Sequence, residues 1–122
     1  MTLMITLYGI PNCDTVKKSR AWFTQQGIDI VFHDFKKQGV PTVQLSQWVE
    51  KLGWELLLNK KGSTWRTLDA ATQAAVVDAA SAMALMQRES SSIKRPVVAL
   101  NNQVTVGYQP VAWSHILSAK LG

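Results

Sequence analysis

The fold is decided by the segment Met4-Ile5-Thr6-Leu7-Tyr8-Gly9-Ile10-Pro11-Asn12-Cys13. Its first five residues are apolar and partly β-branched, which predicts a buried strand that ends at Gly9. After Pro11 the apolar residues follow a helical period, and Gly27 is expected to end that helix. The alternation in Ile30–Phe35 predicts a second strand. Because a helix of about 12 residues joins the two strands, they should pair in parallel.

The middle of the chain is predicted to be helical. One helix should open at Pro41-Thr42 and end at Gly53, and an Ala-rich helical stretch spans residues 68–86 without Gly or Pro. Asp69 and Asp78 are candidate helix starts, so this stretch is either one helix or two.

Strands are predicted again near the end of the chain. Val97–Leu100 and Val104–Val106 flank the turn-forming pair Asn101-Asn102, a pattern typical of a hairpin. Pro110 then opens a last helix. The residues expected on its buried side are Val111, Ala112, Ile116 and Leu117. The order β-α-β, helical block, β-β-α predicts an α/β fold in which a mixed sheet is flanked by helices.

The chain has 122 residues, of which 47% are apolar and 17% are charged. These values predict one soluble globular domain and exclude a disordered tail. The net charge is +5, but the Lys and Arg residues are dispersed, so direct nucleic-acid binding is not expected. No apolar run approaches the roughly 20 residues of a spanning helix, and the N-terminus does not resemble a signal peptide. The cytoplasm is therefore the expected location.

Cys13 is the only cysteine, so an intramolecular disulfide and a multi-cysteine zinc site are excluded. We expect no metal and no bound cofactor. Cys13 lies where the first strand passes into the first helix, and there unpaired N–H groups and the helix dipole favour a thiolate. Lys17, one turn further on the same face, should favour it too. The alternative is that Cys13 is an unreactive buried residue.

Arg95 and Pro96 form a second candidate element. A proline at the start of a strand cannot donate a hydrogen bond to the ladder, which indicates either an edge strand or a cis peptide beside a site. Arg95 is placed to reach the cysteine loop, and the alternative is that it is an exposed surface arginine.

Several segments together resemble the ArsC/Spx family. They are Tyr8-Gly9-Ile10-Pro11-Asn12-Cys13, Lys17-Lys18-Ser19-Arg20-Ala21-Trp22, Leu57-Leu58-Asn59-Lys60-Lys61, Thr64-Trp65-Arg66 and Lys94-Arg95-Pro96. The similarity covers essentially the whole chain and is greatest to the YffB-type glutathione-dependent thiol reductases. It implies a thioredoxin-like fold: one domain over residues 1–122 with a helical insertion at about 41–92. It also implies that Pro96 is a cis proline facing the active-site thiol, with Pro11 as a further structural residue there.

The sequence departs from the arsenate reductases that it resembles. Lys17 stands where their Cys-x-x-x-Arg loop has its arginine. At the positions of three arginines that surround the oxyanion, the resemblance places Asn59, Arg95 and Gln109 in that order. A doubly charged oxyanion requires several guanidinium groups, so arsenate reduction is not favoured. The Cys-x-x-Cys switch of Spx-type regulators cannot form, since Val16 occupies its second position.

Three functions remain open from the sequence. The first is a glutathione-dependent thiol–disulfide oxidoreductase, in which Cys13 is the nucleophile and glutathione or a glutaredoxin-like thiol donor resolves the mixed disulfide. In that interpretation the substrate-binding residues are Lys17, Asn59, Arg95 and Gln109. The second is a Spx-like regulator that binds RNA polymerase without catalysis, and the third is a glutaredoxin-dependent arsenate reductase.

Overall fold

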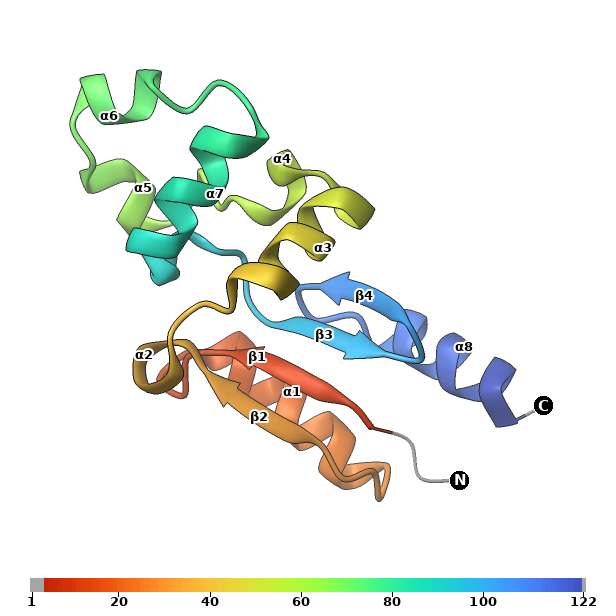
Figure 1. Cartoon of the computed structure of the whole chain (residues 1–122). Coiled ribbons are helices and arrows are strands. Elements are labelled where there is room, and N and C mark those ends of the chain that lie inside the picture. Colours follow the sequence, from red (N-terminus) through yellow and green to blue (C-terminus); the bar gives the residue numbers. More distant parts are fainter. Residues whose placement is uncertain (1–3, 122) are drawn as a thin grey trace. The chain divides into compact units, whose positions relative to one another are not determined.

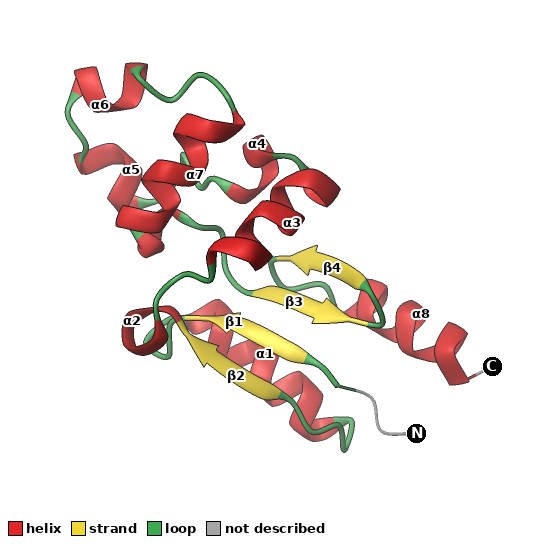
Figure 2. Cartoon of the chain, viewed as in Figure 1, coloured by secondary structure: helices red, strands yellow, loops and turns green. Residues whose placement is uncertain are grey.

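The computed structural model describes residues 4–121, which fall into two compact units. The first unit contains the residues up to Phe35 and those from Arg95 onward, and the second unit is Lys36–Lys94. Figure 1 follows the chain through both units, and Figure 2 shows the strands of the first unit and the helices of the second. The predicted organisation as a single domain with a helical insertion stays a prediction.

Within the described residues, the first unit is built on a four-stranded mixed sheet. Its elements are β1 (Thr6–Gly9), α1 (Asp14–Gln25), β2 (Val31–Asp34), β3 (Val97–Leu100), β4 (Gln103–Val106) and α8 (Pro110–Leu121). The strand order is β2-β1-β3-β4; β1 pairs with β2 in parallel, and the β1–β3 and β3–β4 pairs are antiparallel. The predicted α/β class, the parallel first pair and the hairpin are confirmed.

The turn of the hairpin follows from its two asparagines. Asn101 and Asn102 both have positive φ angles, 51° and 62°. Two consecutive residues of this kind match the twist of the flanking strands, and asparagine tolerates the conformation better than most residues. The pair therefore fixes the register in which Leu100 lies opposite Gln103.

One face of the sheet carries the core of the first unit. The buried cluster consists of Ile5, Leu7, Val16, Phe23, Val98, Leu100, Trp113 and Leu117. Leu7 and Val98 lie opposite each other on β1 and β3, and alternate residues of these strands share their face. Because α1 and α8 both contribute to this cluster, they cover the same face. Burying each large side chain stabilises the fold by roughly 1.5–3 kcal/mol.

Two local predictions were wrong. The second strand ends at Asp34, because Phe35 already begins the short helix α2 (Phe35–Gln38), so the alternation expected for Ile30–Phe35 stops early. In α8, Val111 is 71% exposed, whereas Trp113 is buried. Residues two apart on a helix lie about 200° apart around its axis, so Val111 faces outward when the larger Trp113 faces the core.

The second unit contains short helices. They are α3 (Thr42–Leu52), α4 (Trp54–Leu57), α5 (Ser63–Thr67), α6 (Ala70–Ala74), α7 (Ala79–Arg88) and the 3₁₀ turn η1 (Ser90–Ser92). The Ala-rich stretch forms two helices rather than one. Asp69 accepts a hydrogen bond from the N–H of Thr72, and Asp78 forms a capping box with Ser81. Both candidate helix starts are thus confirmed.

Gly9 determines how closely α1 approaches the end of β1. A Cβ atom at this position would lie 2.8 Å from Cγ2 of Val16, which is fully buried in α1. Since real Cβ atoms do not approach other carbons so closely, only glycine permits this packing. Val16 is three residues from Cys13, so the contact also fixes where the first turn of the helix lies.

We expect Gly9→Ala to destabilise the protein by about 1–3 kcal/mol, because the added methyl group overpacks the contact with Val16. Urea denaturation of Gly9→Ala, Val16→Ala and the double variant measures this. The double variant should lose at least about 0.5 kcal/mol less than the sum of the single losses, because Val16→Ala removes the clashing methyl groups. Strictly additive losses would show that the two residues are not in contact.

Candidate active site

Cys13 directly precedes the first helix. It is the N-cap residue of α1, with an extended backbone (φ −144°, ψ 123°), and the helix begins at Asp14. Its carbonyl oxygen accepts a hydrogen bond from the N–H of Lys17 at 2.9 Å. The side chain is half-buried and packs against the core cluster. The predicted position at the start of the helix is confirmed, and the sulfur remains partly accessible.

The surroundings of the thiol lower its pKa. Burial is the largest influence and by itself raises the pKa of Cys13. The backbone N–H of Val16, the guanidinium of Arg95 and the backbone N–H of Thr15 act in the opposite direction and together outweigh burial. The sulfur accepts no regular cap hydrogen bond, so the N–H groups stabilise the thiolate as dipoles. The direction agrees with the sequence-based prediction, but the cation is Arg95 rather than Lys17.

Arg95 reaches the thiol from the segment that enters β3. Its half-buried guanidinium acts on the sulfur as a hydrogen-bond donor and as a positive charge, so it is not an exposed surface arginine. The Arg95–Pro96 peptide bond is cis, and the carbonyl oxygen of Pro96 accepts a hydrogen bond from the N–H of Gly107 at 2.8 Å. The cis alternative is thus confirmed. The edge-strand alternative is wrong, because β3 lies between β1 and β4.

The other predicted site residues of the first unit are exposed. Lys17 projects from the first turn of α1, and Pro11 lies in the loop before the thiol. Gln109 directly precedes α8, and its Nε2 donates to a backbone carbonyl of β4 at 3.2 Å. The structure joins only Arg95 to Cys13 by a direct side-chain interaction among these predicted residues. The substrate-binding roles of Lys17 and Gln109 and the structural role of Pro11 stay predictions.

Asn59 belongs to the second unit and is held by its own loop. Its Oδ1 accepts a hydrogen bond from the N–H of Lys61 at 3.2 Å, and its backbone N–H donates to the carbonyl oxygen of Ser92 at 2.8 Å. A Cβ atom on Gly62 would lie 2.8 Å from its Nδ2, so glycine leaves room for the amide. This loop fixes the orientation of Asn59, whose substrate-binding role stays a prediction.

Sequence reasoning missed a cation held over an aromatic ring in the first unit. The Nζ of Lys18 lies 4.3 Å from the centroid of the Tyr108 ring. Tyr108 follows Gly107, whose N–H bonds to Pro96, and its ring packs against the same core cluster as Cys13. Nothing in the local sequence pairs residue 18 with residue 108, because they are joined only by the way α1 and the β4–α8 loop fold together.

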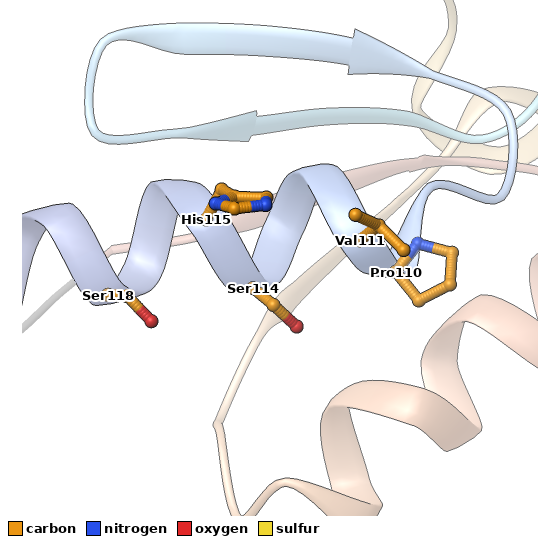
Figure 3. Close-up of a pocket in the computed structure, with 5 residues that line it drawn as sticks. All are labelled: Pro110, Val111, Ser114, His115 and Ser118. Carbon is orange, nitrogen blue, oxygen red and sulfur yellow. The ribbon is translucent and has the colours of Figure 1, made fainter.

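Two hollows in the structure are lined by other residues. One, of about 300 Å³, runs along the outer side of α8 and is lined by Pro110, Val111, Ser114, His115 and Ser118. Figure 3 shows these five side chains along one helix, with the hydroxyl groups of Ser114 and Ser118 directed the same way. The other, of about 360 Å³, lies between α6 and α7. Neither includes a predicted site residue.

The structure also offers no metal centre and no membrane segment among residues 4–121. No three His, Cys, Asp or Glu side chains of this range come together in a way that could hold a metal ion. None of the helices in the same range has both the length and the apolar character needed to cross a bilayer.

Comparison with known proteins agrees with this geometry. The model of the ArsC family matches residues 8–116, a range that includes Cys13, Arg95 and the cis proline. The chain belongs to the ArsC family. The α/β architecture described above is accordingly the thioredoxin-like fold of that family, with Cys13 at the start of α1.

Several similar proteins align along most of the chain. A protein named YFFB is 41% identical, with a TM-score of 0.88, over 93% of this chain and 98% of its own. An arsenate reductase (ArsC) related protein from Brucella melitensis is also 41% identical, with a TM-score of 0.72, over 96% and 95%. An uncharacterized protein of Haemophilus influenzae is 35% identical over 105 residues, which are 86% of this chain and 91% of that protein.

The lowered pKa of Cys13 predicts that the thiol reacts below the pH at which a free cysteine does. The midpoint of a pH series of iodoacetamide alkylation should lie below about 8.5, the value of an unperturbed thiol. Arg95→Met removes a hydrogen bond and a positive charge from the thiolate, so it should move the midpoint upward. Lys17→Met removes the same charge and should move it less. A wild-type midpoint at or above the free-thiol value would contradict the activated thiol.

Proposed function

We propose that this ArsC-family protein is a glutathione-dependent thiol–disulfide oxidoreductase with Cys13 as its single nucleophile. The observation that carries the proposal is the half-buried thiol at the N-terminus of α1, with its pKa lowered by backbone N–H groups and by Arg95. A thiolate is the species that attacks disulfides, and it needs to be present near neutral pH. The match to the family supports the same chemistry.

The reaction has two exchange steps. In the first, the Cys13 thiolate attacks the glutathione sulfur of a mixed disulfide, forms a Cys13–glutathione disulfide and releases the other half as a thiolate, which takes up a proton. In the second, a glutathione thiolate attacks the glutathione sulfur of this adduct. Oxidised glutathione leaves and the Cys13 thiolate is regenerated. Only the incoming glutathione sulfur is oxidised, because the other sulfur of oxidised glutathione comes from the substrate disulfide. The remaining substrate sulfur is reduced to a thiol, so the number of disulfide bonds does not change.

An external thiol is required because the chain has no second cysteine. Cys13 is its only sulfhydryl group, so no internal attack can resolve the adduct. Glutathione is an anionic tripeptide, and its carboxylates suit a chain with a net charge of +5. A glutaredoxin-like protein could supply the second thiol in its place. Such a cycle needs a reducing compartment, and the cytoplasm is the location we propose.

Arsenate reduction is a weaker candidate. Its support is the family match and the printed name of the Brucella melitensis relative, which is arsenate reductase related. Against it stand the uncharged Asn59 and Gln109 at positions where the family resemblance leads one to expect arginines. Each charge-assisted hydrogen bond is worth about 1.5–3 kcal/mol. Two losses should therefore weaken the binding of an oxyanion by roughly a hundred-fold or more.

We expect the protein to reduce the mixed disulfide of glutathione and cysteine when glutathione, glutathione reductase and NADPH are supplied. NADPH oxidation, followed at its absorbance band, should exceed the rate without the protein. Cys13→Ser should return the rate to that background, because serine cannot form the mixed disulfide. The folding of Cys13→Ser should be checked by circular dichroism, so that loss of rate is assigned to the thiol alone.

Wild-type protein that gives no more than the background rate would contradict the proposed activity. A Spx-like regulator would behave in this way and would bind RNA polymerase equally well with Cys13→Ser. In the same coupled assay, with a glutaredoxin added, arsenate at sub-millimolar concentration should give no turnover above background.

A further inference from the structure

We propose that Lys18, held over the ring of Tyr108, binds a carboxylate of glutathione and selects glutathione disulfides over uncharged ones. This inference rests on the proposed function and assigns the residue that recognises the substrate. Its starting observation is the 4.3 Å distance between the Nζ of Lys18 and the centroid of the Tyr108 ring. At this distance the ammonium group is attracted to the negative face of the ring.

The pair is connected to the thiol by two routes through the first unit. Along α1, Lys18 lies five residues after Cys13, the residue that caps this helix. Through the loops, Arg95 interacts with the thiol, the neighbouring Pro96 accepts a hydrogen bond from Gly107, and Tyr108 is the next residue. Both series of neighbouring residues start at Cys13 and lead to the Lys18–Tyr108 pair. Tyr8, Val97 and Val106 lie in register, so the loop that carries Tyr108 leaves the sheet at the same end as the loop that carries Cys13.

Tyr108 is a fixed support rather than a mobile side chain. Its half-buried ring packs edge-on against Trp113, with 5.7 Å between the ring centroids. Trp113 is itself fully buried, and its indole N–H donates to the hydroxyl of Thr105 at 2.8 Å. A ring held in this way restricts where the Lys18 ammonium can lie. Restricting a long side chain before binding lowers the entropy that binding has to overcome.

Lys18 remains able to bind an anion while it contacts the ring. An ammonium group has three N–H donors, and the face of an aromatic ring takes none of them as a conventional acceptor would. The side chain is exposed, so its donors face solvent. A carboxylate can therefore replace water at this ammonium. Lys17 is also exposed, but it has no aromatic support in the structure described by residues 4–118.

The distances suit a tripeptide bound through its sulfur. Five residues of α-helix rise about 7.5 Å and turn about 140° around the axis. Helical side chains incline toward the N-terminus, so the Lys18 ammonium lies nearer to the start of the helix than its own Cα atom does. In glutathione each carboxylate belongs to a residue next to the cysteine, and one extended residue spans about 3.5 Å. The longer γ-glutamyl link of glutathione and the long side chain of Lys18 span the rest of the distance between the Cys13 sulfur and the ammonium group. A disulfide without carboxylates cannot make this contact.

The test compares oxidised glutathione with hydroxyethyl disulfide, which has no charge. The rate of adduct formation on Cys13 is measured by mass spectrometry under pseudo-first-order conditions. We expect Lys18→Met to lower the rate with oxidised glutathione about fivefold, in the range of a partly exposed ion pair, and to leave the rate with hydroxyethyl disulfide unchanged. High salt should shrink the difference between wild type and variant.

Three further variants separate the effect of the Tyr108 ring from general effects of charge. Tyr108→Leu should lower the rate with oxidised glutathione in the same direction as Lys18→Met, whereas Tyr108→Phe, which keeps the ring, should behave as the wild type. Lys36→Met removes one exposed positive charge from the second unit and serves as the charge control. Thermal melts confirm that each variant is folded.

The outcomes distinguish this inference from the proposed function. If wild-type Cys13 forms no adduct with either disulfide, the proposed function itself fails. If the wild type reacts but Lys18→Met loses no rate, loses it equally with both disulfides, or loses no more than Lys36→Met, the assignment of Lys18 is wrong while the thiol chemistry stands.

Discussion

The close approach of α1 to the end of β1 is the constraint on which the site depends. Gly9 has no side chain where a Cβ atom would lie 2.8 Å from Val16, so the first turn of the helix can lie directly against the strand. That turn presents the N–H groups of Thr15 and Val16 to the sulfur of Cys13. A larger residue at position 9 would move the helix start, and the thiolate would lose the dipoles that stabilise it.

Arg95 completes this arrangement from a distant part of the sequence. The antiparallel pairing of β1 with β3 brings the start of β3 beside the end of β1, because Tyr8 lies opposite Val97. The residue two positions before Val97 can therefore reach the thiol that follows β1. Burial opposes the thiolate, and the guanidinium and the N–H groups favour it. The balance gives a thiol that is sheltered but ionises more readily than a free one.

Local signals predicted most of the elements. Asn101-Asn102, Asp69 and Asp78 each impose a turn or a helix start through their own backbone or side chain, so their effect can be seen in the sequence. The errors arose where packing decided between residues of similar type. Val111 faces outward because Trp113 buries more apolar surface in the same helix.

The site was predictable in part for the same reason. Cys13 could be singled out because a strand-to-helix loop has local meaning. The proline at the strand entrance left an edge strand and a cis peptide open, and only the family resemblance favoured the cis form. The cation that acts on the thiol could not be chosen from the sequence, since Lys17 is near in the chain and Arg95 is near only in the fold. No local pattern in the sequence pairs Lys18 with Tyr108, because 90 positions separate residue 18 from residue 108.

The intact mass of the protein after incubation with oxidised glutathione shows whether Cys13 is an activated nucleophile for glutathione. We expect one added glutathionyl group, located on the peptide that contains Cys13 and removed again by reduced glutathione. Protein that keeps its unmodified mass, while free cysteine is converted under the same conditions, would contradict it.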